Sequence, residues 1–185
     1  MKRAKDVSKD MGLTFNDLML GIASVAMKKY FLSNNDHTKE ISVAMPYSFN
    51  SIPKDMSKYK FGNSFASLTV YMPLEEDIMV ACKAVKKRMD FVKKSMLPSG
   101  VYTLLWAYNI VFPYFWTNYV SRGSGCKHSL LISNIPGYVK PVTYAGGCKV
   151  KRSFFLGSGS GSLATSIGII SCYKRAQFSI NSDES

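Results

Sequence analysis

Two polar side chains, Ser133 and Asn134, stand where the sequence pattern predicts that a buried strand ends. The strand is indicated by the short apolar run at residues 130–132, within the segment 128–137. Pro136 favours an extended residue before it, and Gly137 permits a turn with positive φ, so we expect both to be structural. Strand ends that lead into open loops often carry functional groups, which makes the two polar side chains candidates for chemistry. A plain turn, in which Asn134 bonds its own backbone, fits the same composition.

The composition is that of one folded domain covering residues 1–185. A hydrophobic fraction of 46% is too high for a disordered chain, and 185 residues can bury a core of their own. The net charge of +12 indicates an anionic partner, such as lipid headgroups, a phosphorylated cofactor or nucleic acid, unless it serves solubility alone. Nucleic acid is the least expected of these, because the aromatic residues are not interleaved with basic ones and no nucleic-acid-binding motif is present.

The cysteines and histidines do not have the spacing of a metal site. No two cysteines are separated by only two residues, and the chain has only two histidines, so we expect no zinc site. The cysteines are instead typical of free thiols in a reducing compartment. The charged residues 1–5 are not followed directly by an apolar segment, so we expect no signal peptide.

A helix is predicted over residues 12–32 from its wide apolar face. Thr14 is a candidate N-cap, and Asp17 stands three residues later, as in a capping box. Asn16 and Asp17 could be catalytic, but a carboxylate at a helix start already meets the positive end of the helix dipole. We therefore expect Asn16 and Asp17 to be structural.

Two strands and a second helix follow. Strands are predicted at residues 41–45, ended by Pro46, and at residues 64–71. Residues 77–95 predict an amphipathic helix whose polar face is rich in lysine and arginine. Such a helix could lie on an anionic membrane or pack on a sheet with its basic face in water, since either arrangement buries the apolar stripe.

Residues 101–120 are apolar and aromatic and contain no charged residue. Their length would just span a bilayer, but Pro113, Asn109 and Asn118 interrupt them, and the aromatic residues are not confined to the two ends. We expect a helix bent at Pro113 that is buried in the protein or embedded in one leaflet of a membrane. A transmembrane helix is the alternative that the length alone permits.

The remainder of the chain predicts short strands joined by glycine-rich turns. Residues 144–147 indicate a turn, and residues 157–162 a flexible loop, because the latter lack the lysine of a phosphate-binding loop. Residues 166–173 and 176–180 predict a hairpin that turns near Lys174. The order of elements predicts a mixed α/β class, with helices covering one face of a mixed sheet.

Several stretches resemble, in the same order, motifs of the C-terminal domain of the wax ester synthase/diacylglycerol acyltransferase family. They are residues 12–18, similar to its Asn-Asp helix start; Met45-Pro46 and residues 61–63, similar to its strand ending in proline and its Gly-Asn strand start; residues 133–137 and 144–147, similar to its Ser-Asn-Val-Pro-Gly and Ala-Gly turns; and residues 171–183, similar to its closing hairpin. Together they cover nearly the whole chain.

The resemblance implies one half of a chloramphenicol acetyltransferase-like two-domain fold, in which two similar α/β halves enclose a tunnel. It also implies transfer of a fatty acyl group from acyl-CoA, as substrate, to diacylglycerol or a long-chain alcohol, with no further cofactor and no metal. In the family, the general base is the second histidine of a His-His-x-x-x-Asp motif in the N-terminal half. This sequence has no such motif, and neither His37 nor His128 has a second histidine beside it, so we expect the catalytic half to be absent from these residues.

The chemistry requires a base and a hydrogen-bond donor. An alcohol attacks a thioester readily only when a base removes its proton, and the resulting oxyanion must be stabilised. The resemblance makes Ser133 or Asn134 the candidate donor in the tunnel, and it implies association with the cytoplasmic face of the endoplasmic reticulum, the plasma membrane or a lipid droplet. The alternative is a non-catalytic lipid- or membrane-binding module of the same fold, because the base is missing from this chain.

Overall fold

The computed structural model describes most of the chain. The described residues are 2–50, 57, 62, 64–125, 127–138, 140–157, 165–172 and 175–182. Their elements, in chain order, are α1 (Lys2–Asp10), α2 (Phe15–Ser33), β1 (Glu40–Ser48), β2 (Phe65–Pro73), α3 (Ile78–Lys94), α4 (Leu97–Val111), α5 (Tyr114–Gly125), β3 (Leu130–Pro136), the short 3-10 helix η2 (Ala145–Gly147), β4 (Thr165–Cys172) and β5 (Arg175–Ser182). Helix α1 is not among the predicted elements; its sequence is mostly charged, and its only two apolar residues are Ala4 and Val7.

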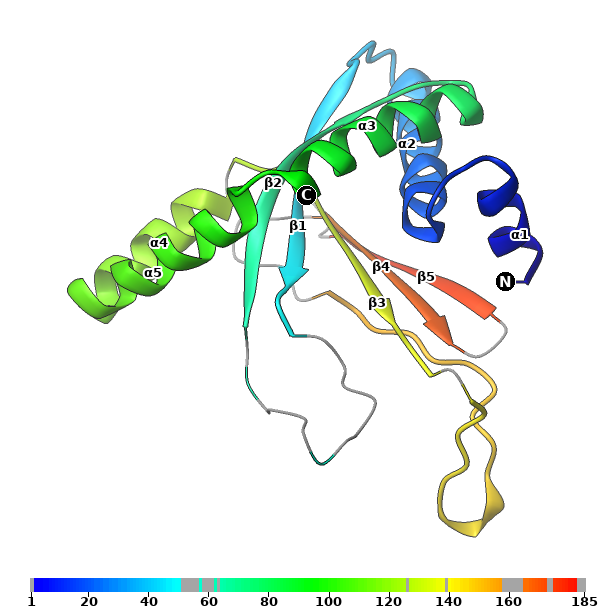
Figure 1. The fold of residues 1–185 in the computed structure, drawn as a ribbon. Coiled ribbons are helices and arrows are strands. Elements are labelled where there is room, and N and C mark those ends of the chain that lie inside the picture. Colours follow the sequence, from blue (N-terminus) through cyan, green and yellow to red (C-terminus); the bar gives the residue numbers. More distant parts are fainter. Residues whose placement is uncertain are drawn as a thin grey trace.

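Five strands form one mixed sheet with the order β2-β1-β3-β4-β5. The two outer pairs, β1–β2 and β4–β5, are antiparallel, whereas β3 lies parallel to both β1 and β4. Helices α2 and α3 cross one face of the sheet, with α1 beside α2 (Figure 1). The predicted class, a mixed sheet with helices on one face, is therefore confirmed.

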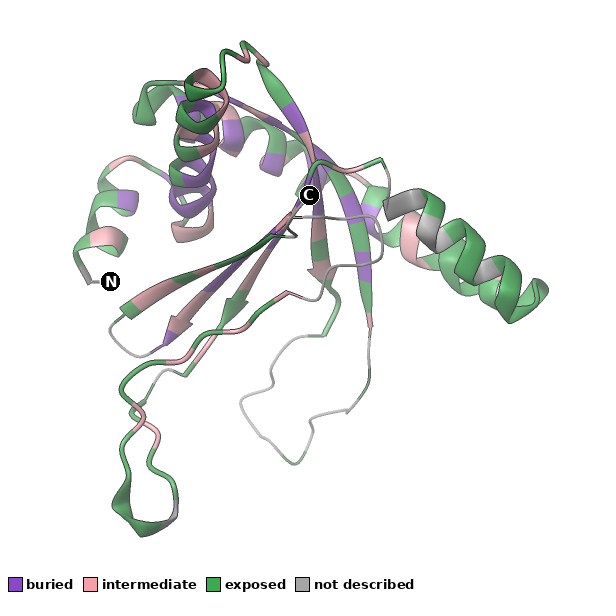
Figure 2. Ribbon diagram, turned by 180° about the vertical axis from the view of Figure 1, so that it is seen from behind, coloured by how far each residue is buried: buried purple, intermediate pink, exposed green. Residues whose placement is uncertain are grey.

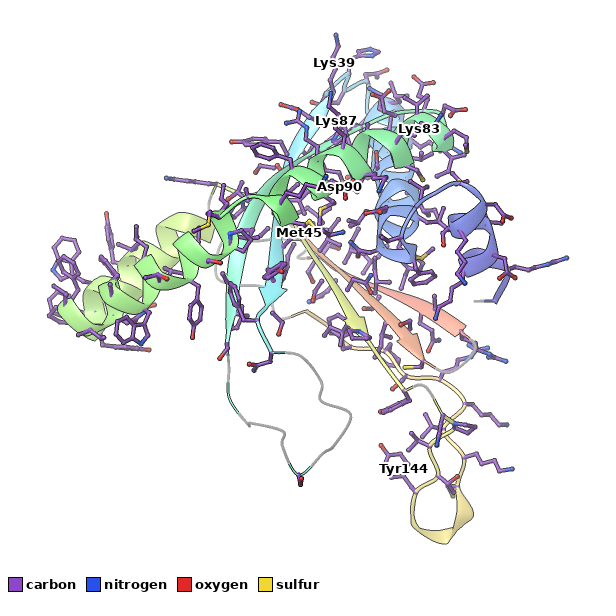
Figure 3. The ribbon with its side chains drawn as sticks, viewed as in Figure 1. Lys39, Met45, Lys83, Lys87, Asp90 and Tyr144 are labelled. Atoms are coloured by element: carbon purple, nitrogen blue, oxygen red, sulfur yellow. The ribbon has the colours of Figure 1, made fainter. Side chains whose placement is uncertain are left out.

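The core lies between this sheet and helices α2 and α3 (Figure 2). The apolar stripe of α3 faces it, and its buried members are Ala81, Cys82, Val85, Met89 and Val92. The basic side chains of α3 that Figure 3 labels, Lys83 and Lys87, are exposed on the outer side of the helix. Of the two arrangements open for this helix, packing on the sheet is the one observed.

Helices α2 and α3 approach each other closely at Gly21 and Cys82. A methyl group on Gly21 would lie 3.0 Å from the Cα of Cys82 and closer still to its Sγ. Because both residues are buried, we expect Gly21→Ala to lower the free energy of unfolding by about 1–3 kcal/mol, measured by urea denaturation. The double variant Gly21→Ala/Cys82→Ala should recover only part of this loss. It removes the clash with the Sγ of residue 82 but not the close contact with its backbone. Unchanged stability in Gly21→Ala would contradict the close approach.

Two prolines expected to follow the ends of strands lie inside strands instead. Pro46 is within β1, where the pairing with β3 is confined to Val43 and Ala44. Beyond Ala44 no described strand pairs with that edge of β1, so the missing N–H of Pro46 breaks no hydrogen bond there. Pro136 is the last residue of β3, and Asn134 therefore lies within the strand rather than after it.

Residues 101–120 form parts of two helices rather than one bent helix. Helices α4 and α5 lie side by side and are joined at Phe112 and Pro113 (Figure 1). The expectation that this stretch is buried in the protein is wrong. Of the α4 side chains that the structure describes, only that of Pro98 is buried. No helix within the described ranges has the length and apolar character needed to cross a membrane.

The last third of the chain contains a projecting segment and a hairpin. Residues 140–150 project from the sheet (Figure 1), whereas Ser153 and Phe155 are hydrogen-bonded to side chains of β5. The predicted turn at 144–147 is confirmed by the φ values of Gly146, 81°, and Gly147, 79°. Strands β4 and β5 confirm the predicted hairpin. Its turn, and all but Gly157 of the predicted loop at 157–162, lie outside the described residues.

Candidate functional site

A groove opens where β1 and β3 separate. The two strands pair at only two positions, and beyond them the groove has a volume of about 540 Å³. One wall is the end of β1, the other is β3, and helices α2 and α3 close it from above; Met45 lies in it beneath α3 (Figure 3). Its lining residues are Thr14, Phe15, Asn16, Met45, Pro46, Tyr47, Ser48, Leu68, Val70, Met89, Val92, Lys93, Ile132, Asn134, Pro136 and Ser171.

Two asparagines from distant parts of the chain meet in this groove. The Nδ2 of Asn134, on β3, donates a hydrogen bond of 2.7 Å to the Oδ1 of Asn16, in the first turn of α2. Each amide retains hydrogen-bonding groups that this bond does not use. The pair therefore offers N–H donors to a polar atom in an otherwise mostly apolar groove.

Asp17 lies behind this pair and is completely buried. Its Oδ2 accepts the backbone N–H of Thr14 at 3.0 Å, and the Oγ1 of Thr14 accepts the N–H of Asp17 at 3.2 Å, which confirms the predicted capping box. The Oδ1 of Asp17 has no hydrogen-bond partner and lies 3.9 Å from the Nζ of Lys93. Desolvation and, second, the charge of Asp17 raise the pKa of Cys82.

Positive groups line the groove, and the buried carboxylate of Asp17 lies 3.9 Å from one of them, the Nζ of Lys93. Lys93 lines it, and the N-terminus of α2 also reaches it through Thr14, Phe15 and Asn16. The unsatisfied N–H groups at a helix start carry partial positive charge. The charge of Lys93 and of the helix start is partly offset by the buried carboxylate of Asp17, which leaves the amide N–H groups of the asparagine pair as the main donors to an oxygen in the groove.

The structure does not bring Ser133 to the groove. Successive side chains of a strand point to opposite faces, and the groove is lined by Ile132, Asn134 and Pro136 of β3. Ser133 therefore faces the other side of the sheet, beside Gly168 of β4. Of the two oxyanion candidates, only Asn134 faces the groove.

Gly137 serves close packing rather than a turn. Its φ is not positive, but a Cβ at this position would lie 2.9 Å from the carbonyl oxygen of Ser171. The N–H of Gly137 donates to the same oxygen at 3.0 Å. The expected turn with positive φ at this position is therefore wrong, because β3 continues alongside β4 as far as Pro136.

Neither histidine reaches the groove. His37 lies in an exposed loop after α2, and His128 precedes β3. Burial, and to a smaller extent Lys127, lowers the pKa of His128. In the part of the chain that the structure describes, the groove lining contains no histidine and no carboxylate, so it offers no general base. The described residues also contain no group of three or more histidine, cysteine, aspartate or glutamate side chains that could hold a metal ion.

Comparisons with known proteins identify the family. Residues 61–185 match the model of the WS/DGAT C-terminal domain. The chain belongs to this family. Among the curated proteins, no match was found.

Solved structures resemble this WS/DGAT C-terminal domain over nearly its whole length. The wax ester synthase/diacylglycerol acyltransferase from Marinobacter aquaeolei VT8 is 16% identical, with a TM-score of 0.63. The match covers 98% of this chain but only 40% of that protein. The first condensation domain of the CDA synthetase is 12% identical with a TM-score of 0.55, covering 97% of this chain and 36% of that one. A condensation domain from the enacyloxin polyketide synthase is 13% identical with a TM-score of 0.55, covering 100% and 34%. These likenesses show the chloramphenicol acetyltransferase-like fold.

The site contains features that the sequence pattern did not indicate. Lys93 appears in the sequence as one of several basic residues on an amphipathic helix, and nothing distinguishes it from the others. The sequence pattern does not place Tyr47 and Ser48 at the site, because it predicts that the strand ends at Pro46, whereas β1 continues to Ser48. The hydrogen bond between Asn16 and Asn134 joins residues that are 118 positions apart, and no local sequence pattern relates the two.

Proposed function

We propose that this chain is part of an O-acyltransferase that moves a fatty acyl group from acyl-CoA to diacylglycerol or a long-chain alcohol. The observation that carries the proposal is the convergence of Asn16, Pro46 and Asn134 in one groove. These residues come from three separate stretches that resemble motifs of the family. The apolar walls of the groove suit an acyl chain, and the amide pair suits the polar atom at its head.

In the proposed reaction, a base from an N-terminal half takes the proton of the alcohol as the oxygen attacks the thioester carbonyl. Negative charge moves to the carbonyl oxygen, which accepts an N–H of Asn134 that Asn16 does not use. When the carbonyl re-forms, the carbon–sulfur bond breaks and CoA leaves as the thiol after taking the proton. Asn16 is a positioning residue, because it holds the Asn134 amide.

The proposal includes a second half that this chain lacks. It would carry the His-His-x-x-x-Asp motif, and the two halves together would enclose the groove as a tunnel. The Marinobacter relative, of which this chain matches 40%, has room for such a half. We further propose that the enzyme works at the cytoplasmic face of the endoplasmic reticulum, the plasma membrane or a lipid droplet, where its lipid acceptors are found.

The test is an acyl-transfer assay on the complete natural protein that contains this chain. Its extent is established by sequencing the transcript to the 5′ end and by the mass of the endogenous protein. With radiolabelled palmitoyl-CoA, we expect a labelled triacylglycerol from diacylglycerol or a labelled wax ester from hexadecanol. A protein that carries the histidine motif, is folded and yields neither product would contradict the proposal.

A non-catalytic lipid-binding module is the second candidate. It is favoured by the groove itself, whose described lining offers no general base. If the mature protein in the cell consisted of these 185 residues alone, that result would support the lipid-binding module over the acyltransferase. The module would then bind radiolabelled diacylglycerol without turning over acyl-CoA.

A further inference from the structure

The α4–α5 hairpin exposes more large apolar side chains than any other part of the described structure. It projects from the side of the sheet at β2 (Figure 1), and Figure 2 shows it almost wholly exposed. Its exposed apolar residues include Leu104, Leu105, Trp106, Ile110, Val111, Phe112, Phe115, Trp116, Tyr119 and Val120. Apolar patches of this kind on a folded domain mark a site of interaction.

The exposed side chains surround α4 rather than forming one stripe. Leu104, Leu105 and Trp106 are consecutive, and successive residues of a helix are about 100° apart, so these three alone span about 200° of its circumference. A protein partner that covers one face of the helix would leave the others in water. A helix that is apolar on all sides needs apolar surroundings on all sides, which lipid provides.

The hairpin has one charged residue, Arg122 near the end of α5, and its base is basic. No charged residue occurs between Lys94 and Arg122, whereas Lys93 and Lys94 precede the hairpin and Lys127 follows it. Helix α3 presents further exposed lysines, among them Lys83 and Lys87, farther along the helix from the hairpin (Figure 3). Lysines beside an apolar segment are attracted to anionic headgroups while the segment enters the layer below them.

The lengths of the two helices limit how deep the hairpin can go. Helices α4 and α5 have 15 and 12 residues, which correspond to about 22 Å and about 18 Å. The hydrocarbon core of a bilayer is about 30 Å thick. The hairpin can therefore enter one leaflet without crossing the membrane.

We propose that the α4–α5 hairpin inserts into one leaflet of an anionic phospholipid membrane and holds the groove at its surface. The inference names the lipid surface at which the proposed acyltransferase works, and to that extent it rests on the proposed function. Its test measures binding alone, so failure of acyl transfer and failure of membrane insertion are separate results.

Tryptophan fluorescence tests the insertion directly. The chain has two tryptophans, Trp106 and Trp116, and both lie in the hairpin. On adding vesicles of phosphatidylcholine and phosphatidylserine, we expect the emission to shift to shorter wavelength. Lipids brominated near the headgroup should quench it more than lipids brominated at the chain ends. Vesicles of phosphatidylcholine alone should bind more weakly, because they lack the anionic charge.

A matched pair of variants assigns the binding to the hairpin. Leu104, in α4, and Ile180, in β5, are each 69% exposed, so glutamate at either position should leave the fold intact, as circular dichroism would verify. We expect Leu104→Glu to weaken vesicle binding about tenfold or more and Ile180→Glu to change it less than about threefold. Equal weakening by both variants would contradict the proposal. So would an emission that vesicles leave unchanged, as expected if another protein segment or a second copy already covers the hairpin.

Discussion

Replacing Asn134 with alanine is expected to lower kcat/KM for acyl transfer about 100-fold in the complete enzyme. Asn134 lies in the groove, and its amide is the candidate donor to the oxygen that becomes negative when the alcohol attacks. Loss of one such donor typically raises the barrier of acyl transfer by a few kcal/mol. The effect should appear mainly in kcat, because the donor acts on charge that develops in the transition state.

The neighbouring residue is the matched control. Ser133→Ala removes a hydrogen-bonding side chain from the same strand but from the opposite face of the sheet, so we expect turnover to remain near that of the native enzyme. If Ser133→Ala were as damaging as Asn134→Ala, the assignment of the groove would be wrong.

Asn16→Ala separates positioning from direct action. Because Asn16 acts through the amide of Asn134, the double variant with Asn134→Ala should be little worse than Asn134→Ala alone. Additive losses would mean that each amide acts separately on the substrate. Rescue of part of the activity by Asn16→Asp, which keeps an acceptor oxygen, would support the positioning function.

Replacing Asp17 with alanine is expected to lower the free energy of unfolding by about 2–3 kcal/mol. The carboxylate is completely buried and caps α2 by accepting the N–H of Thr14. Its removal leaves that N–H without its partner and leaves a small cavity beneath the groove. Urea denaturation monitored by circular dichroism measures the change.

Two further variants identify the source of that stability. Asp17→Asn keeps an oxygen that can accept from Thr14, so we expect it to lose less than Asp17→Ala. Lys93→Met should lower the free energy of unfolding by about 1–2 kcal/mol, because it takes the nearby cation from the buried Oδ1 of Asp17 but leaves the cap on Thr14 in place. A larger effect of Lys93→Met than of Asp17→Ala would show that charge pairing, rather than capping, stabilises the helix start.

The sequence by itself determined the elements whose signals are local. The capping box of Thr14 and Asp17 involves residues three positions apart, and the apolar stripe of α3 repeats within each turn of the helix. The β4–β5 hairpin likewise joins strands that are adjacent in sequence. Such features depend on hydrogen bonds and packing over a few residues, so their pattern can be recognised without the rest of the fold.

The limits of the strands could not be predicted in this way. A proline ends a strand only if its missing N–H would have met a partner, and the sequence does not say which edge is paired. Pro46 is tolerated inside β1 because the described structure pairs that edge with β3 only at Val43 and Ala44. The same separation of β1 and β3 opens the groove. The wrong prediction that β1 ends at Pro46 and the failure to predict the groove therefore have one cause.

Only the tertiary structure decided which residues form the candidate site. The bond between Asn16 and Asn134 depends on the packing of α2 across β3, and the exclusion of Ser133 depends on the face to which each side chain of β3 points. It also decided that residues 101–120 fold back on themselves as two exposed helices rather than entering the core. These outcomes depend on contacts between residues far apart in sequence. Hydrophobic periodicity does not predict such contacts, because it shows only which side of a helix or strand is apolar and not which element packs against that side.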